Sequence, residues 1–289
     1  MEEPVRVRLE MTSYPENVAL VRAALSGLAA ATELDDELAA DLKTAISEAC
    51  NNVVLHAYDG GSGPLTVEIT GLHNGISAVV SDRGMGITRI SSGEDRVGLG
   101  LAIMSALADR AEFRAAEGGG TEVRMWFARD TAIVEAPSLE PPAEWAAHVA
   151  FELIGDLVTW LSPANLARSV LGRVFRSTAA AAHFSVGKLS EFYALNDAIA
   201  QYVELAADGQ LGVAISSSSR RISITGGPFR VLGASPAGDP AEGSRELDDL
   251  KQAGGSIVDT LTTERLNSVE LLHLVLVDTT REGSRSRSD

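Results

Sequence analysis

The amino-acid sequence predicts an α+β protein whose helices and strands form two domains. Three observations lead to this prediction. The chain has 289 residues, which is enough for two domains of about 100 to 150 residues each. Segments that alternate like strands are interspersed with segments that have the 3.6-residue period of amphipathic helices. Part of the pattern of the first half recurs in the second half, so we expect two related units.

The composition is that of a globular protein, with 45% hydrophobic and 22% charged residues. Acidic residues outnumber basic ones 40 to 24, and the net charge of -16 disfavours binding to nucleic acid or to an anionic membrane. The single cysteine, Cys50, excludes an internal disulfide. The N-terminus does not look like a secretory signal, and no apolar run is long enough to span a bilayer. We therefore expect a cytoplasmic protein.

The order of elements in the first half can be predicted from periodicity. Residues 5–11 alternate as a strand, and a helix with Pro15 in its first turn follows from about residue 13. A second helix is expected over residues 35–58, two strands over 65–70 and 76–81, a third helix after Gly100, and a last strand over 121–127. Residues 130–145 contain three prolines and are expected to be an interdomain linker.

The second half repeats part of this order. A shift of 146 residues places Leu65, Val67 and Ile69 on Leu211, Val213 and Ile215, and it places Val123 and Met125 on Val269 and Leu271. A shift of 148 places residues 15–19 on 163–167. Two unrelated β-rich segments can share such a pattern by chance, but the matching order favours a diverged tandem duplication. The second domain is expected over residues 146–280, with a disordered tail at 281–289.

Three polar residues lie on one face of the second predicted helix. Glu48, Asn52 and His56 are spaced four residues apart, and a carboxylate and an amide so placed can act as a general base and a metal ligand. Such pairs are more often solvated helix surface. Asn51, three residues after Glu48, is also close to it, so helix geometry alone does not decide which asparagine is functional.

Three glycine-containing segments follow along the chain. Asp82-Arg-Gly84-Met-Gly86 ends a predicted strand, where the carboxylate can accept a hydrogen bond from an exocyclic amine. Gly98 and Gly100 precede the third predicted helix, whose N-terminus can bind a phosphate. Gly118-Gly-Gly120-Thr121 leads into the last strand. Each segment alone is an ordinary turn.

Together, these four segments occur in the order and on the elements of the N, G1, G2 and G3 boxes of the GHKL ATPase superfamily, which they resemble. The segment Ser47–Tyr58 resembles the anti-sigma factor serine kinase branch. The resemblance covers residues 5–129. It implies a two-layer α/β sandwich of the GHKL (Bergerat) type with a mixed, mostly antiparallel sheet over residues 1–129, followed by a second diverged copy.

Three features favour this branch over sensor histidine kinases. No helical hairpin with a phosphoacceptor histidine precedes the domain, the lid over residues 87–97 is short, and membrane segments are absent.

The resemblance also implies roles for individual residues. Glu48 is the general base, Asn52 holds Mg²⁺, and Asp82 accepts the adenine amino group. Arg96 is a candidate lid cation that neutralises charge on the transferred group, although a solvated surface arginine is an equal alternative. The remaining nucleotide-binding residues implied by the resemblance are Gly84, Gly86, Gly98, Gly100 and Thr121.

The function implied by the resemblance is that of an ATP-dependent serine protein kinase and anti-sigma factor. Such a protein phosphorylates an STAS-type anti-sigma factor antagonist and sequesters a sigma factor. The alternatives are a non-catalytic, ATP-gated protein-binding module, and a histidine-kinase-like ATPase of another signalling pathway.

The second half departs from this pattern. The shift of 146 residues places Glu48, Asn52 and Asp82 on Ala194, Ala198 and Pro228. We therefore expect a degenerate second domain without nucleotide-binding boxes. The protein is then either a monomer with pseudo-dimeric tandem domains or a homodimer.

Overall fold

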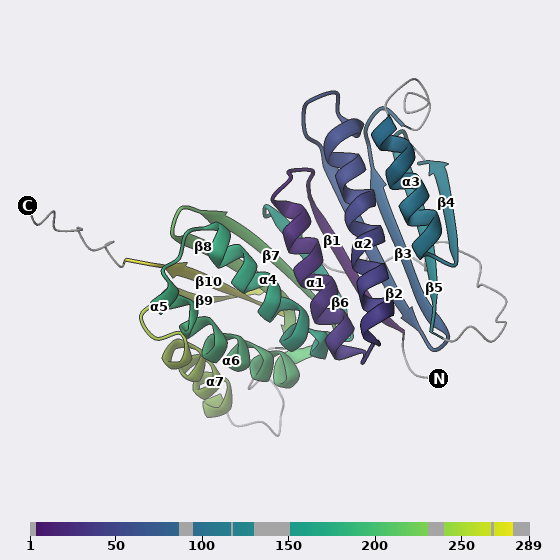
Figure 1. The fold of residues 1–289 in the computed structure, drawn as a ribbon. Helices are drawn as coiled ribbons and strands as arrows, with labels where there is room; N and C mark the ends of the chain where they lie inside the picture. Colours follow the sequence, from purple (N-terminus) through teal and green to yellow (C-terminus); the bar gives the residue numbers. More distant parts are fainter. Residues whose placement is uncertain are drawn as a thin grey trace, which may run out of the picture.

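The residues that the structure describes form one continuous sheet of ten strands, and helices cover one of its faces (Figure 1). The computed structural model describes residues 4–86, 95–116, 118–129, 151–230, 240–266 and 269–279, with the backbone alone at 95–98, 208 and 240–246. The predicted linker 130–145 and tail 281–289 lie outside the described residues. Among the described residues, no helix is both long and apolar enough to cross a membrane.

The described residues of the first half form five strands. Its elements are, in order, β1 Val5–Thr12, α1 Asn17–Ala31, α2 Asp36–Asn52, the π-helical turn η1 Val53–Ala57, β2 Pro64–Leu72, β3 Gly75–Asp82, α3 Asp95–Leu107, β4 Arg110–Ala115 and β5 Thr121–Ala128. The helix expected over 35–58 is therefore α2 continued by η1. The strand β4 was not predicted.

The second half contains the same succession of strands and long helices. Its elements are β6 Leu157–Ser162, the 3-10 turn η3 Ala164–Leu166, α4 Ala167–Ala181, α5 Val186–Leu189, α6 Glu191–Ala206, β7 Ala207–Ser218, β8 Arg221–Arg230, α7 Pro240–Ala253, β9 Val258–Leu266 and β10 Val269–Val277. The strand order across the sheet is β4-β5-β3-β2-β1-β6-β7-β8-β10-β9. Read outward from the centre, the two halves therefore have the same topology.

Each of the nine pairs of neighbouring strands in the described residues is antiparallel, whereas a mixed sheet was expected. The reason lies in the connection through α3. It carries the chain from β3 to β4, which runs in the same direction as β3 but two positions away. The returning strand β5 fills the position between them and is antiparallel to both.

The two halves meet at strands β1 and β6. Val7, Leu9 and Met11 of β1 lie opposite Leu161, Thr159 and Leu157 of β6. These side chains are buried beneath the helices, in an apolar core that runs without a break from one half into the other. Since β1 also pairs with β2, both of its edges are hydrogen-bonded.

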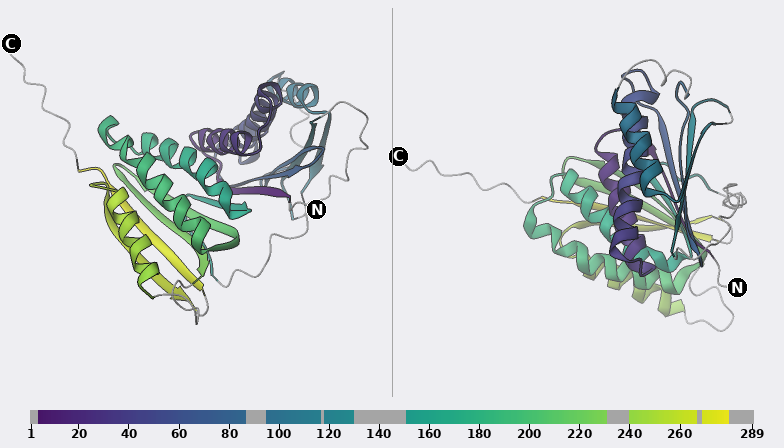
Figure 2. Two further views of the ribbon diagram at one scale, coloured as in Figure 1. Left: turned by 90° about the horizontal axis from the view of Figure 1, so that it is seen from below. Right: turned by 45° about the vertical axis from the view of Figure 1, so that its right-hand side comes forward.

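Helices α1 and α4 cross closely above this strand pair (Figure 2). Gly27 of α1 permits the approach, because a Cβ at this position would lie only 2.4 Å from the backbone oxygen of Ser169 in α4. The helix layer is therefore continuous across the junction, like the sheet below it.

The structure corrects part of the repeat alignment. Glu33 and His183, 150 residues apart, both have positive φ (51° and 61°) at the end of the first long helix of their half. The same offset superposes the buried positions of α2 on those of α6, so Glu48 corresponds to Ala198 and Asn52 to Tyr202. The expected partners, Ala194 and Ala198, are displaced by one helical turn, because the offset of 146 holds for the strands after the helix and not for the helix itself.

The last strand is also displaced. Val80 pairs with Val123, and Gly226, which is 146 residues after Val80, pairs with Leu272. Val123 therefore corresponds to Leu272 rather than to Val269. The replacement of both Glu48 and Asn52 in the second half is unaffected by these corrections.

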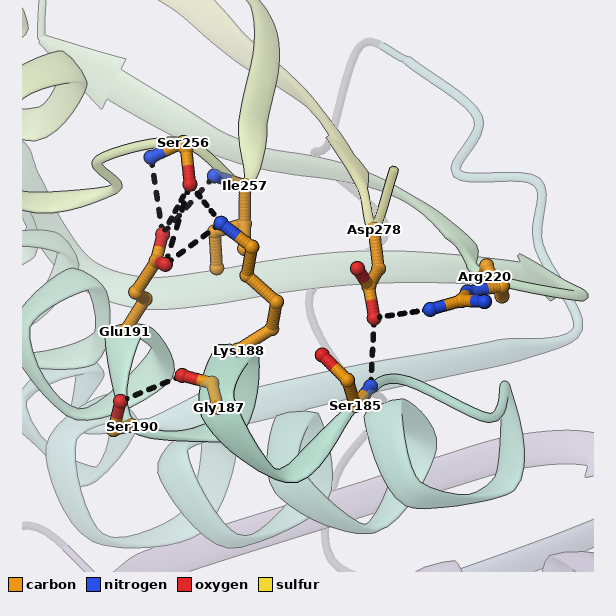
Figure 3. A network of polar contacts seen from close by, with 9 residues as sticks. All are labelled: Ser185, Gly187, Lys188, Ser190, Glu191, Arg220, Ser256, Ile257 and Asp278. Atoms are coloured by element: carbon orange, nitrogen blue, oxygen red, sulfur yellow. Dashed lines mark hydrogen bonds and ion pairs between the residues drawn. The ribbon is translucent and has the colours of Figure 1, made fainter. Parts of the chain in front are cut away.

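A polar network ties the start of α6 to the turn before β9 (Figure 3). Glu191 accepts hydrogen bonds from the backbone amides of Ser256 (3.0 Å) and Ile257 (3.1 Å), and Lys188 donates to it at 2.9 Å. Nearby, Asp278 accepts from the amide of Ser185 at 2.6 Å. In the first half, the corresponding helix start is capped locally, by Asp35, which accepts from the Leu38 amide at 2.8 Å.

We expect Gly27→Ala to destabilise the protein by about 1–3 kcal/mol, because the added methyl group meets backbone atoms of α4 that cannot rotate away. Urea unfolding of the full chain measures this change. Gly187→Ala is the matched control, since a Cβ at Gly187 of α5 meets nothing within 4 Å. Equal stability of the two variants would show that α1 and α4 do not pack as described.

Candidate functional site

A pocket opens in the first half between α2, η1, α3 and the strands β3, β4 and β5. It encloses about 620 Å³ when its open mouth is counted. The lining residues are Ala49, Asn52, Val53, His56, Ala57, Val80, Asp82, Gly86, Leu101, Phe113, Thr121 and Val123.

Most of the residues that line the pocket are apolar, and one of them, Asp82, carries a carboxylate. Asp82, at the end of β3, is only 4% exposed. Burial raises the pKa of its carboxyl group, and this effect is opposed by hydrogen bonds from the backbone amide of Gly84 and from the amide and hydroxyl of Thr121. The Gly84 amide lies 2.7 Å from Asp82 Oδ1. A desolvated acceptor held in this way is suited to a ligand that offers a hydrogen-bond donor.

Two glycines around Asp82 are required by close contacts. A Cβ at Gly84 would lie 2.1 Å from the backbone oxygen of Ala57, and a Cβ at Gly120 would lie 2.1 Å from the backbone oxygen of Asp82 itself. Gly120 also has φ +95°, and Gly86 has φ +77°, both in the region that favours glycine. The glycines predicted from the sequence therefore let three backbone segments meet at the floor of the pocket.

Asn52 lies in the last turn of α2 and lines the pocket. A Cβ at Gly100 of α3 would lie 3.2 Å from its Oδ1 atom, so the side chain lies against α3. Asn51 is half-buried but does not line the pocket. The structure thus separates two asparagines that helix spacing alone left equivalent.

The structure brings together Asn52, Asp82, Gly86 and Thr121, and it places Gly84 directly beside them. Glu48 is half-buried on α2, one turn before Asn52, and it does not line the pocket. Arg96 and Gly98 belong to α3, but their side-chain surroundings lie outside the described residues, as do residues 87–94 of the lid.

One local expectation was wrong. The third helix was predicted to begin after Gly100, but α3 begins at Asp95, so Gly98 and Gly100 lie inside its first two turns. Glycine lowers helix propensity without ending a helix whose other residues are favourable. The backbone amide of Gly100 therefore lies within the helix and not at its N-terminus. The contribution of Gly100 to the site is that it has no side chain, which leaves room for the side chain of Asn52.

Several pocket residues were not found from the sequence. Phe113 lies on β4, the strand that was not predicted. The sequence pattern that could have indicated this strand is the alternation of the apolar residues Ala111 and Phe113 with charged residues. His56, which the helix spacing placed on the same face as Asn52 but to which no role was assigned, lines the pocket from η1. Cys50, by contrast, is a packing residue: it is fully buried, and burial raises the pKa of its thiol to about 12.

Comparisons with known proteins agree on the identity of this unit. A family model described as "Histidine kinase-like ATPase domain" matches residues 11–127. The anti-sigma F factor of Caldanaerobacter subterraneus is 33% identical over 135 residues, which are 43% of this chain and 94% of the relative. The chain belongs to the GHKL family of histidine kinase-like ATPases, in its anti-sigma factor kinase branch.

One further relative and one solved structure match part of the chain. The serine-protein kinase RsbW of Bacillus pumilus is 32% identical over 129 residues, which are 39% of this chain and 80% of that relative. A solved structure of RsbU and RsbW domains from Mycobacterium tuberculosis matches with a TM-score of 0.33 and 23% identity, over 44% of this chain and 32% of that one.

The buried carboxylate predicts a pH dependence in the nucleotide-free protein. Since the pKa of Asp82 is raised on folding, its contribution to stability is fully present below the unfolded value of 3.8 and is lost as pH rises through the folded pKa. NMR titration of carboxyl carbons should give a midpoint above 3.8 for Asp82.

Thr121→Val should raise this midpoint further, because the Thr121 hydroxyl stabilises the ionised form. Thr66→Val, on the opposite face of the sheet, is the control and should leave it unchanged. A midpoint for Asp82 at or below 3.8 would contradict the described burial.

Proposed function

We propose that the first half, residues 1–129, is an ATP-dependent serine protein kinase. We further propose that the chain is an anti-sigma factor, which phosphorylates an STAS-type anti-sigma factor antagonist and sequesters a sigma factor. The observation that carries the proposal is the buried Asp82 carboxylate in the wall of a pocket shared with Asn52 and Thr121. The relatives named anti-sigma F factor and serine-protein kinase support it.

The adenine base is assigned to the apolar part of the pocket. Asp82 accepts a hydrogen bond from the exocyclic amine, and Thr121, already bonded to Asp82, lies on the same side. Val80, Val123 and Phe113 supply apolar surface for the ring. A buried acceptor of this kind discriminates strongly against bases that lack the amine, because it would then be left unpaired.

The phosphates are assigned to the side of the pocket where α2 faces α3. The amide oxygen of Asn52 fits Mg²⁺, which prefers oxygen ligands and takes few of them from the protein when it is bound to phosphates. When bound, Mg²⁺ neutralises charge on the phosphate oxygens. Gly98 and Gly100 let the first turns of α3 approach the phosphates, and Arg96 is the candidate cation of the lid.

Glu48 is assigned as the general base. The serine oxygen of the acceptor protein forms a bond to the γ-phosphorus, the bond from this phosphorus to the β,γ-bridging oxygen breaks, and ADP leaves. The serine proton passes to the Glu48 carboxylate. Phosphoryl transfer depends mainly on positioning and charge compensation, so the site needs no covalent intermediate.

The phosphorylated antagonist gains a charge of about -1.5 to -2. Because the kinase is itself acidic, with a net charge of -16 over the chain, repulsion and desolvation weaken the complex. The released kinase then binds its sigma factor. The expected location in the cytoplasm stays a prediction.

A second candidate function is a non-catalytic, ATP-gated protein-binding module. It is favoured by the position of Glu48, which does not line the pocket. In that case, nucleotide binding orders the lid and the partner is held without being phosphorylated.

The second half, residues 146–280, is proposed to be a degenerate copy of the domain that binds no nucleotide. Tyr202 occupies the position of Asn52, is 2% exposed, and packs edge-on against Phe229 at a centroid distance of 5.0 Å. Pro228 occupies the position of Asp82, and Ile199 that of Ala49. Bulky side chains thus take the place of the acceptor and the amide, and the pocket beside Ile199 and Phe229 is lined by apolar residues and glycine, with no carboxylate or amide side chain.

The same half is proposed to act as a built-in partner subunit. Its strand β6 covers the edge of β1, and its helix α4 covers α1, so neither surface is free to bind a second copy of the chain. The protein is then a monomer with pseudo-dimeric tandem domains, rather than the homodimer that was the other expectation.

We expect Glu48→Gln to lower the rate of phosphoryl transfer to an STAS-type antagonist by about 10²- to 10⁴-fold, because the acceptor hydroxyl loses its base. ATP affinity should change less than about twofold, since the proposal places Glu48 outside the nucleotide contacts. Transfer from radiolabelled ATP measures the first quantity, and calorimetry measures the second.

The control for this experiment is Glu37→Gln, an exposed carboxyl in the first turn of the same helix, which should change neither quantity. Transfer at the native rate by Glu48→Gln would defeat the assigned mechanism. Absence of transfer by the native protein, with ATP binding intact, would favour the non-catalytic module.

A further inference from the structure

Tyr58 connects three segments of the candidate site. It follows η1 directly, and its hydroxyl accepts a hydrogen bond from the backbone amide of Arg83 at 3.0 Å and donates one to the backbone oxygen of Pro64 at 2.5 Å. Arg83 is the residue after Asp82, and Pro64 begins β2. One phenol group therefore joins the end of η1, the start of β2 and the end of β3.

The turn after Asp82 depends on this contact. Its three successive amides each have an acceptor: Arg83 donates to Tyr58 Oη, Gly84 to Asp82 Oδ1 at 2.7 Å, and Met85 to the Ala57 backbone oxygen at 2.9 Å. Two of the three acceptors come from residues 57 and 58. The end of η1 therefore determines where the backbone that carries Asp82 lies.

The contact has no room to shift. A Cβ at Gly63 would lie 2.2 Å from the Tyr58 ring, so the ring packs directly on the chain that leads into β2. On the other side, a Cβ at Gly84 would lie 2.1 Å from the Ala57 oxygen. Such tight packing holds a hydrogen bond in one geometry.

The protonation state of the phenol suits this role. A tyrosine hydroxyl ordinarily keeps its proton at neutral pH, and burial raises the pKa of Tyr58 above that ordinary value. Only the protonated form can donate to Pro64 while it accepts from Arg83.

The second half shows that the fold forms without this arrangement. There, α6 ends at Ala206 and β7 begins at Ala207, and the position of Tyr58 is taken by Asp208 within the strand. Pro228 stands at the position of Asp82. The phenol contact and the buried carboxylate are thus present together in one half and absent together from the other.

We propose that Tyr58 is a positioning residue for adenine recognition, which sets the orientation of the Asp82 carboxylate through the Arg83 amide. This inference rests on the proposed nucleotide-binding function. It assigns to Tyr58 a role in selecting the base rather than only in folding.

The test is Tyr58→Phe in the full chain, with ATP and inosine triphosphate as probes. Inosine triphosphate carries a carbonyl group in place of the purine amine. We expect the affinity for ATP to fall about tenfold, and the affinity for inosine triphosphate to change less than about twofold, so that the preference for ATP is largely lost. Competition against a fluorescent ATP analogue measures both affinities.

Tyr193→Phe, at an exposed tyrosine of α6, is the matched control and should leave both affinities unchanged. Gly63→Ala is a second variant that displaces the Tyr58 ring without removing its hydroxyl, and it should reduce the same preference. Equal loss for both nucleotides, an unchanged preference, or unfolding of both variants would overturn the proposal.

The outcome also distinguishes this inference from the proposed function. If the native chain binds neither nucleotide, the nucleotide-binding function itself fails. If the native chain prefers ATP and Tyr58→Phe keeps that preference in full, only the role of Tyr58 fails.

Discussion

The pairing of β1 with both β2 and β6 is the interaction on which the rest of the structure depends. It makes one sheet out of two five-stranded units and lets their helices share one apolar core. A strand with one free edge would expose a row of unpaired backbone groups to other chains. Here the second half covers that edge permanently, and the close crossing at Gly27 adds a helix contact above it.

The two halves have the same topology but differ in the residues at the position of the pocket. In the first half, small residues leave a pocket, and a costly buried carboxylate is kept there by three hydrogen bonds. In the second half, Tyr202 and Ile199 stand at the positions of Asn52 and Ala49, and the pocket beside Ile199 and Phe229 is lined by apolar residues and glycine. These hydrogen bonds only partly offset the desolvation of the carboxylate, so a copy that does not bind a ligand gains stability by replacing it.

The sequence was sufficient for the α+β class, for most strands and helices of the first half, and for the residues that gather around Asp82. These depend on local periodicity and on glycines whose spacing reflects close backbone contacts. It was insufficient for β4, whose alternation is short, and for the start of α3, where glycines do not interrupt the helix. The sequence offset between corresponding residues of the two halves is 150 up to the end of α6 and 146 in the strands that follow. The offset changes because the second half lacks the loop that joins η1 to β2 in the first half. A single offset therefore could not align both the helices and the strands.

We propose that one chain carries one functional site and supplies its own partner domain. Native mass spectrometry of the full chain with a slowly hydrolysed ATP analogue and Mg²⁺ measures both the number of chains and the number of nucleotides in the complex. We expect a single 30.3-kDa chain with one bound nucleotide. Two nucleotides on each chain, or a stable complex of two chains, would contradict it.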